Sequence, residues 1–186
     1  MNPACNICIH MVASLDGYIA RKDNSVSWFD TTDQYAAGVN GEDPAEFLAT
    51  IDAYVMGANT YAHALALSAT YGWAYTGKPC IVVSSRPLAA EQPLVEIFNG
   101  NLLSLVNEVL APRYTNVWVV GGAALVHDFL RQQLAQEIRL TILPIMLGDG
   151  LPFFTATRPQ QPLHLKNVTA YKNGMVELHY QLLPGT

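Results

Sequence analysis

The sequence predicts a single α/β domain over residues 1–186, with a mostly parallel central sheet and an antiparallel C-terminal hairpin. Three observations predict this fold class. Short runs rich in Val and Ile, bounded by Gly, Pro, Asn or Asp, are typical of buried strands. Segments with helical spacing of apolar residues alternate with these runs. Asn173-Gly174 separates the last two runs, and Asn-Gly between alternating runs is a strong hairpin signal.

Eight runs are expected to form strands. Six of them are short, apolar and rich in β-branched residues, which favours the parallel part of the sheet: residues 7–13, 53–56, 80–84, 95–98, 117–120 and 138–144. The last two, residues 163–171 and 175–183, flank the Asn-Gly turn and form the hairpin.

Helix signals lie between these strands. Asp43 before Pro44 resembles an N-cap residue followed by proline at the first helical position. A second helix is predicted by helical spacing and is expected to end at Pro112; its apolar residues are Leu102, Leu103, Leu105, Val106, Val109 and Leu110. A third follows Gly121-Gly122, with the apolar stripe Leu125, Val126, Phe129, Leu130 and Leu134.

The composition limits the classes of function. The chain has 186 residues, 51% of them hydrophobic, so it can bury one sizeable core. Its net charge is −5, which leaves no basic field for a nucleic acid. No apolar run reaches the roughly 20 residues of a membrane span, and no signal peptide is recognisable. Three cysteines, an odd number, favour a reduced, cytoplasmic protein.

Polar or glycine-containing segments directly follow four of the expected strands. In open α/β sheets, ligands bind beyond the carboxyl ends of the strands, so these segments are the candidate site. They are Ser-Leu-Asp-Gly at 14–17, Gly-Ala-Asn-Thr-Tyr at 57–61, Ser-Ser-Arg-Pro at 84–87 and Gly-Gly-Ala-Ala at 121–124.

Together these segments suit a phosphorylated nucleotide. Two of them begin helices, whose unpaired N–H groups and positive dipole ends favour a pyrophosphate, and glycine lets the backbone approach it closely. Ser84, Ser85 and Arg86 offer hydroxyl groups and a guanidinium to a terminal phosphate such as the 2′-phosphate of NADP. Each segment alone is more often an ordinary turn, and their shared placement carries the prediction. The Rossmann pattern G-x-G-x-x-G is absent from the chain.

The chain resembles the dihydrofolate reductase superfamily, and within it the small proteins similar to the reductase domain of the bifunctional riboflavin-biosynthesis deaminase-reductase. Five segments and Trp28 carry the resemblance, in order and over most of the chain: residues 11–20, 52–61, 81–87, 117–125 and 140–150. The resemblance implies a three-layer dihydrofolate-reductase-like fold. It also implies hydride transfer from NADPH.

The resemblance further implies which residues bind the cofactor. Ala13 and Ile19 match positions whose backbone meets the nicotinamide amide. The remaining positions match the phosphate contacts and their neighbours: Gly57, Asn59, Thr60, Tyr61, Ser84, Ser85, Arg86, Val120, Gly121, Gly122, Ala123, Ala124 and Leu125. The bond between the two glycines is expected to be cis, as is typical of the family. Residues 16–28 are expected to form a lid over the site.

The substrate side rests on fewer residues. Ala13, Trp28, Val120 and Thr141 are expected to line the substrate pocket. The resemblance assigns the catalytic carboxylate to Asp33, which would be buried and supported by Thr141, with Asp30 as its rival. An alternative interpretation is that Asp30 and Asp33 only begin a helix.

Three functions are weighed. The first is a reductase of the riboflavin-precursor type, acting on a pyrimidine- or pterin-type small molecule. The chain departs from the usual riboflavin enzymes at Val120, which replaces an acidic residue. The second is a dihydrofolate or pteridine reductase, although only Lys78 lies near the place of the arginine that binds the folate tail. The third is a non-catalytic nucleotide-binding module. A homodimer through apolar C-terminal strands is expected, with neither nucleic acid, membrane nor metal as a partner.

Overall fold

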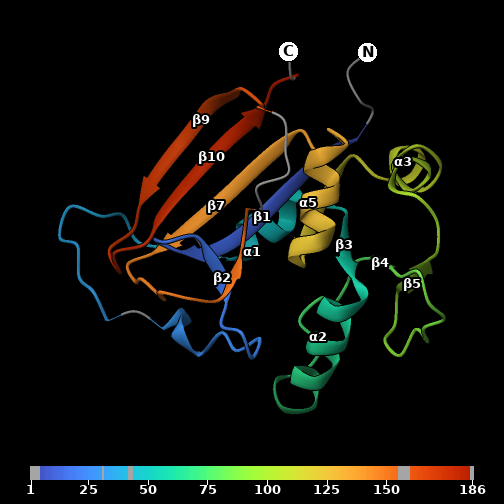
Figure 1. The fold of residues 1–186 in the computed structure, drawn as a ribbon, viewed down its shortest axis with the longest axis horizontal. Coiled ribbons are helices and arrows are strands. Elements are labelled where there is room, and N and C mark those ends of the chain that lie inside the picture. Colours follow the sequence, from blue (N-terminus) through green and yellow to red (C-terminus); the bar gives the residue numbers. More distant parts are fainter. Residues whose placement is uncertain (1–4, 31, 42–43, 155–159, 185–186) are drawn as a thin grey trace.

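The computed structural model describes residues 5–30, 32–41, 44–154 and 160–184. Within them, one sheet contains strands in the order β5-β4-β3-β6-β1-β7-β10-β9 (Figure 1). The parallel strands are β1 (Asn6–Ser14), β3 (Ala53–Gly57), β4 (Cys80–Val83), β5 (Val95–Phe98), β6 (Asn116–Gly121) and β7 (Glu137–Leu143). β10 (Val176–Leu182) is antiparallel to β7 and to β9 (Leu163–Ala170). The predicted fold class is therefore confirmed.

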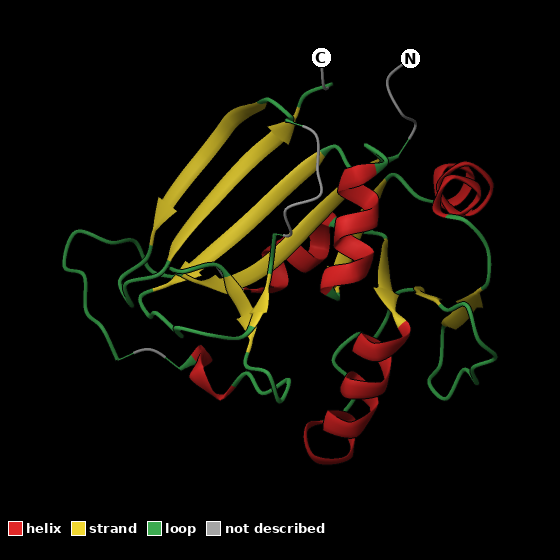
Figure 2. Cartoon of the chain, in the orientation of Figure 1, coloured by secondary structure: helices red, strands yellow, loops and turns green. Residues whose placement is uncertain are grey.

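Helices cover both faces of the sheet (Figure 2). On one side lie α1 (Pro44–Thr50) and α2 (Ala58–Tyr71), and we call this side the α1 face. The core here joins Phe47 and Leu48 of α1 and Tyr61 of α2 to sheet residues such as Tyr54 and Met56. This layer is rich in aromatic rings. Trp118 contacts both Tyr54 and Phe47, with centroid distances of 5.7 and 5.3 Å.

The opposite side of the sheet, the α5 face, carries the larger core. α5 (Ala123–Arg131) inserts Val126 and Phe129, both fully buried, against Ile7, Ile9 and Val119 of the central strands. A second helical segment covers the same core with Leu102, Leu105 and Leu110, and runs through α3 (Leu102–Ser104), the π-helical η2 (Leu105–Leu110) and α4 (Ala111–Arg113). The two covering layers and the sheet between them make the three-layer arrangement expected from the sequence.

Three details depart from the sequence-based expectations. The helical segment ends at Arg113, one residue beyond Pro112, so Pro112 lies in its last turn and the predicted end is displaced by one residue. The short sheet of β2 (Tyr18–Ala20) and β8 (Leu151–Pro152), and the 3₁₀ turn η1 (Ser27–Phe29), were not predicted, because such short elements carry no periodic pattern. Asp43, the expected N-cap residue, lies outside the described residues.

Candidate functional site

The structure brings the four predicted segments to one side of the molecule. β4, β3, β6 and β1 are neighbours in the sheet and run in the same direction. Gly57 pairs with Val83, and Met56 pairs with Gly121, so these strands end at the same level. We call the region beyond their last residues the carboxyl end of the sheet.

Two glycines and a threonine meet at the centre of this carboxyl end. A Cβ atom placed on Gly122 would lie 3.1 Å from Oγ1 of Thr60, and one on Gly57 would lie 3.8 Å from the nitrogen of Gly122. The start of α2 therefore lies against the start of α5, although the two helices are more than sixty residues apart in sequence. This juxtaposition confirms that Thr60 and Gly122 share one surface.

The two helix starts present free backbone donors. Gly57 is the N-cap residue of α2 and Gly122 that of α5, and glycine has no side chain with which to cap the first N–H groups. These donors include the backbone N–H groups of Asn59 and Ala124, and both residues are exposed. The peptide bond between Gly121 and Gly122 is cis, as predicted, and Gly121 has φ of +133°, which favours glycine. The arrangement suits an anion held by backbone N–H groups.

The segment after β4 adds a cation to the same region. Ser84 is buried, and its hydroxyl group donates to the carbonyl oxygen of Arg86 at 2.7 Å, which shapes the turn. Ser85 and Arg86 are exposed beyond this turn. Since β4 lies beside β3 and strands are spaced about 4.8 Å apart, Arg86 extends from the position next to the start of α2. Ser84 therefore holds the turn, which leaves Ser85 and Arg86 as the side chains able to meet a phosphate.

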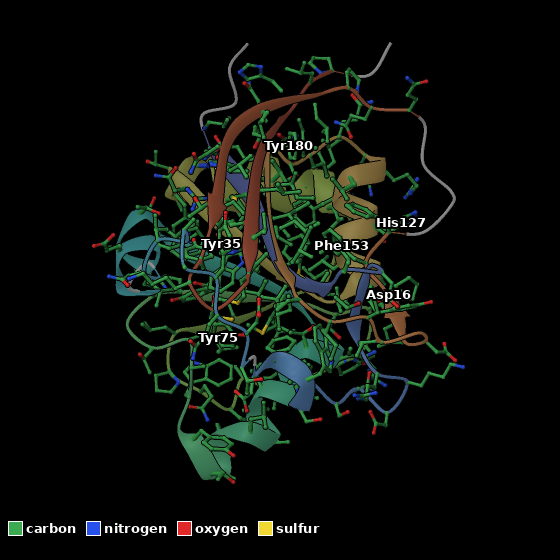
Figure 3. The ribbon with its side chains drawn as sticks, turned by 90° about the vertical axis from the view of Figure 1, so that its left-hand side faces the viewer. Asp16, Tyr35, Tyr75, His127, Phe153 and Tyr180 are labelled. Carbon is green, nitrogen blue, oxygen red and sulfur yellow. The ribbon has the colours of Figure 1, made fainter. Side chains whose placement is uncertain are left out.

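A carboxylate organises the turn after β1. Asp16 accepts hydrogen bonds from the Ser14 hydroxyl group at 2.6 Å and from the backbone N–H groups of Leu147 and Gly148 at 3.1 and 2.7 Å. These bonds, with the one from Ser14 as the largest cause, lower the pKa of Asp16 below its usual value. Ala13 is buried at the end of β1, and Ile19 packs on the α5-face core. Asp16 thus ties the first turn of the expected lid to the loop after β7 (Figure 3).

Not every predicted cofactor residue has an available side chain. Tyr61 is fully buried, and its hydroxyl group accepts a hydrogen bond from the Glu91 N–H at 2.7 Å. Leu125 is buried in the α5-face core. Only the backbone of these two residues lies near the helix starts. The resemblance gives the positions of these residues along the chain but not the direction of their side chains.

Two of the residues expected on the substrate side, Thr141 and Val120, lie on the α1 face. Thr141 is buried on β7, opposite Val12 of β1 and Glu177 of β10. Val120, on β6, is half-buried in the α1-face core. Trp28 is buried, and its indole N–H has no hydrogen-bond partner among the described residues. A buried donor of this kind is available to a ligand or a water molecule.

The expected burial of Asp33 is wrong. Asp33 is exposed, as is Asp30, and residues 32–40 form a loop instead of the helix of the alternative interpretation. The Asp33 carboxyl group packs against Gly174 in the β9–β10 turn, where any Cβ on the glycine would collide with it. The same loop donates from the N–H of Tyr35 to the carbonyl oxygen of Lys172 at 2.7 Å (Figure 3). Asp33 and Tyr35 line a cavity of about 320 Å³ with Gly174 and Met175.

A buried carboxylate does exist beside Thr141, but it is Glu177. The Glu177 carboxyl group lies 3.5 Å from Nε2 of His10 and 3.4 Å from Nη1 of Arg139. The hydrogen bond from His10, its largest cause, lowers the pKa of Glu177 despite burial. The Phe47 ring covers both partners, 4.6 Å from the His10 ring and 5.3 Å from the Arg139 guanidinium. Sequence reasoning missed this cluster because its members come from three separate strands.

The cysteines have the properties of core residues. Cys5, Cys8 and Cys80 are all free and buried. Burial raises the pKa of Cys5 to about 11 and those of Cys8 and Cys80 to about 12, so their reactive thiolate forms are disfavoured at neutral pH. Within the described ranges, no group of His, Cys, Asp or Glu side chains is arranged to hold a metal ion. Nor does any described helix have the length and apolarity required to cross a membrane.

The strand order and the helices on both faces define a dihydrofolate-reductase-like α/β domain. The chain belongs to the RibD C-terminal domain family, whose model matches residues 6–177. It is 30% identical over 172 residues to the uncharacterised protein YwjB of Bacillus subtilis, an alignment that covers 92% of this chain and 95% of that protein.

Solved structures show the same fold. A putative riboflavin biosynthesis protein from Shewanella sp. PV-4 superposes with a TM-score of 0.81 at 24% identity, over 96% of this chain and 99% of that one. A diaminohydroxyphosphoribosylaminopyrimidine deaminase/5-amino-6-(5-phosphoribosylamino)uracil reductase from Thermotoga maritima gives 0.66 at 14% identity, over 96% of this chain and 57% of that one. The chain thus spans a little more than half of that bifunctional protein.

Proposed function

We propose that the protein is an NADPH-dependent reductase that transfers a hydride to a pyrimidine- or pterin-type heterocycle. The observation that carries the proposal is the meeting of Thr60, Gly122 and the two uncapped helix starts at one carboxyl end, one strand away from Arg86. Free N–H groups suit the pyrophosphate, and a guanidinium suits the 2′-phosphate. When bound, the cofactor would supply the hydride.

The chain's own residues would bind and orient the two reactants. The backbone of Ala13 and Ile19 would meet the nicotinamide, and Val120, Thr141 and Trp28 would line the space for the heterocycle. The turn held by Asp16 would close over the pair and exclude water, which strengthens polar interactions in the site. The family and the Thermotoga maritima relative support a substrate related to the riboflavin precursor.

Dihydrofolate reduction has less support. That function was linked to a buried carboxylate at Asp33 and to a cation near Lys78. Asp33 is exposed, and the Lys78 ammonium group is engaged by the carbonyl oxygens of Leu48 and Ile51 at the end of α1. Neither group is placed to hold the folate molecule at its two ends.

Ligand-dependent thermal stability tests the cofactor assignment. NADPH at one hundred times its dissociation constant is expected to add about 2.7 kcal/mol of stability, which raises Tm by about 5–10 °C in a chain of this size. NADH should give a clearly smaller shift at equal concentration, because it lacks the 2′-phosphate. If no nucleotide changes Tm, the proposed NADPH-dependent function is contradicted.

We also propose a homodimer through β9 and β10. Leu163, Leu165 and Val168 are about half exposed on β9, on the α5 face, where β10 places Tyr180 and Leu182 beside them. α5 covers the central strands and leaves these outer strands uncovered (Figure 1). An exposed apolar patch of this kind on the sheet suits a self-complementary interface between two copies.

Light scattering tests the dimer. The native protein is expected to have twice the 20.3 kDa mass of the chain. A Leu165→Lys variant should shift toward the monomer mass, because a lysine in an apolar interface must be desolvated. The matched control is Leu67→Lys on α2, which is similarly exposed but lies on the α1 face, and should keep the dimer mass. A monomeric native protein would contradict the proposal.

A further inference from the structure

We propose that residues 32–40 form a strap that docks on the β9–β10 turn and opens as one unit to uncover a cavity. The strap lies between η1 and α1 in the chain, and Figure 1 shows it passing around the end of the β9–β10 hairpin. Val176, at the start of β10, pairs with Ile142 of β7. The next residue of β7, Leu143, pairs with Ser14 at the end of β1. The turn therefore lies level with the carboxyl end of the sheet.

Three main-chain hydrogen bonds hold the strap on the turn. The N–H of Tyr35 donates to the carbonyl oxygen of Lys172 at 2.7 Å. The N–H of Val39 donates to the carbonyl oxygen of Ala170 at 2.9 Å, and the carbonyl oxygen of Val39 accepts from the N–H of Lys172 at 2.8 Å. A further bond of 3.0 Å, from the N–H of Gly38 to the carbonyl oxygen of Tyr35, closes a turn within the strap. This turn joins the two ends of the docked segment, so they should move together.

Two glycines allow the strap and the turn to approach closely. A Cβ atom on Gly38, in the strap, would lie 2.5 Å from the carbonyl carbon of Tyr171. A Cβ atom on Gly174, in the turn, would collide with the Asp33 carboxyl group. Neither position can carry a side chain while the strap is docked, unless the backbone shifts. The two surfaces therefore fit each other closely.

Little apolar packing holds the strap in place. Tyr35 and Val39 are 48% and 52% exposed. Among the residues that the structure describes, neither hydrophobic core contains a side chain from residues 32–40. Segments with few buried apolar contacts and exposed hydrogen bonds open at a lower free energy than the whole domain. The strap thus combines a close fit with weak attachment, as expected of a segment that opens while the domain stays folded.

A cavity of about 320 Å³ lies between the strap and the hairpin. Asp33 and Tyr35 form its wall on the strap side. The opposite wall belongs to the hairpin and its edge, and consists of Ala170, Gly174, Met175 and Val176. Release of the strap removes one wall, so the position of the strap controls access to the hairpin side of the cavity.

Hydrogen exchange in the native protein, followed by NMR, tests the opening. The N–H groups of Tyr35, Val39 and Lys172 should have protection factors within about threefold of one another, and roughly a hundredfold or more below that of the fully buried Val119. Lys172 is decisive because its N–H bonds to the strap, whereas the N–H of Tyr171 bonds within the hairpin. Tyr171 should therefore exchange about tenfold or more slowly than Lys172.

A substitution in the strap should weaken its attachment without altering the hairpin. Gly38→Ala is expected to lower the protection of Val39 and Lys172 about tenfold or more, because the added Cβ meets backbone atoms of the turn. Tyr171 should change by less than about threefold, since its N–H bond lies within the hairpin. Gly41→Ala is the matched control: it makes the same change three residues further along, where a Cβ has no atom within 4 Å, and should leave all three unchanged.

Thiol labelling measures access to the cavity. Met175→Cys places a thiol in the hairpin wall, and the three native cysteines are buried. Adding Gly38→Ala should raise the labelling rate of this thiol about fivefold or more, whereas adding Gly41→Ala should not change it. Leu67→Cys, on the exposed part of α2, should react at the same rate with and without Gly38→Ala.

Four outcomes would overturn the inference. They are strap N–H groups that exchange as slowly as the central strands, strap N–H groups without protection, equal effects of Gly38→Ala and Gly41→Ala on exchange, and unchanged labelling of Met175→Cys. If Gly38→Ala does not fold, the exchange of Lys172 relative to Tyr171 in the native protein decides. None of these measurements uses a ligand, so their result is independent of the proposed reductase function.

Discussion

An Arg86→Gln variant is expected to bind NADPH about 10- to 100-fold more weakly than the native protein while keeping its affinity for NADH within about twofold. Hydrogen bonds to charged groups contribute about 1.5–3 kcal/mol, and each 1.4 kcal/mol is a factor of ten. Arg86 is exposed after a turn that Ser84 holds by its own hydroxyl group, so the substitution leaves the turn intact. Fluorescence titration of both nucleotides measures the change.

The control is Arg113→Gln, which removes an exposed guanidinium paired with Glu96 at the end of α4. It removes one positive charge, as Arg86→Gln does, but away from the carboxyl end of the sheet. This variant should keep the NADPH affinity within about twofold. Equal loss in both variants would mean that general electrostatic attraction, and not a site at Arg86, binds the 2′-phosphate.

A Phe129→Ala variant is expected to lower the free energy of unfolding by about 3–5 kcal/mol. Phe129 is fully buried, and it packs from α5 into the core that also contains Ile7, Ile9 and Val119. Removing its ring leaves a cavity between the helix and the sheet, because both sides are held by other contacts. At about 2–4 °C per kcal/mol, Tm should fall by about 10 °C.

The control for this loss is Leu103→Ala on α3. Leu103 is 53% exposed, and surface substitutions of this kind usually change stability by less than about 0.5 kcal/mol. Urea unfolding of both variants measures the difference. A Phe129→Ala variant as stable as the Leu103→Ala variant would show that α5 does not contribute to the main core.

Most of the sheet is predictable from the sequence because its strands are buried on both faces. Val55 and Val117 are fully buried, and continuous Val- and Ile-rich runs are what such strands require. The hairpin was predicted from Asn173-Gly174, where Gly174 has φ of +79°. The meeting of Thr60 and Gly122 was also predictable, since strand ends in a parallel sheet meet at one end and both residues lie at helix starts.

The substrate side was harder to predict because long-range pairing decides it. Asp33 lies in a loop whose path depends on hydrogen bonds to the distant turn at Lys172, which local sequence does not show. In the sequence, Glu177 is an ordinary polar residue in a strand where polar and apolar residues alternate. Its burial becomes visible only when β10 pairs with β7 and places it beside Arg139. Charges from three strands form a cluster that no spacing along the chain predicts.

The hydrogen bonds that Asp16 accepts link two loops that are distant in sequence. A single carboxylate receives the Ser14 hydroxyl group from its own turn and two N–H groups from the Leu147–Gly148 segment. Residues 14–17 therefore cannot move away from residues 147–148 unless these bonds break. Two backbone hydrogen bonds of 2.8 Å, from the Leu15 N–H to the Ile145 carbonyl oxygen and from the Phe153 N–H to the Gly17 carbonyl oxygen, reinforce this link, so the two segments should move as one unit.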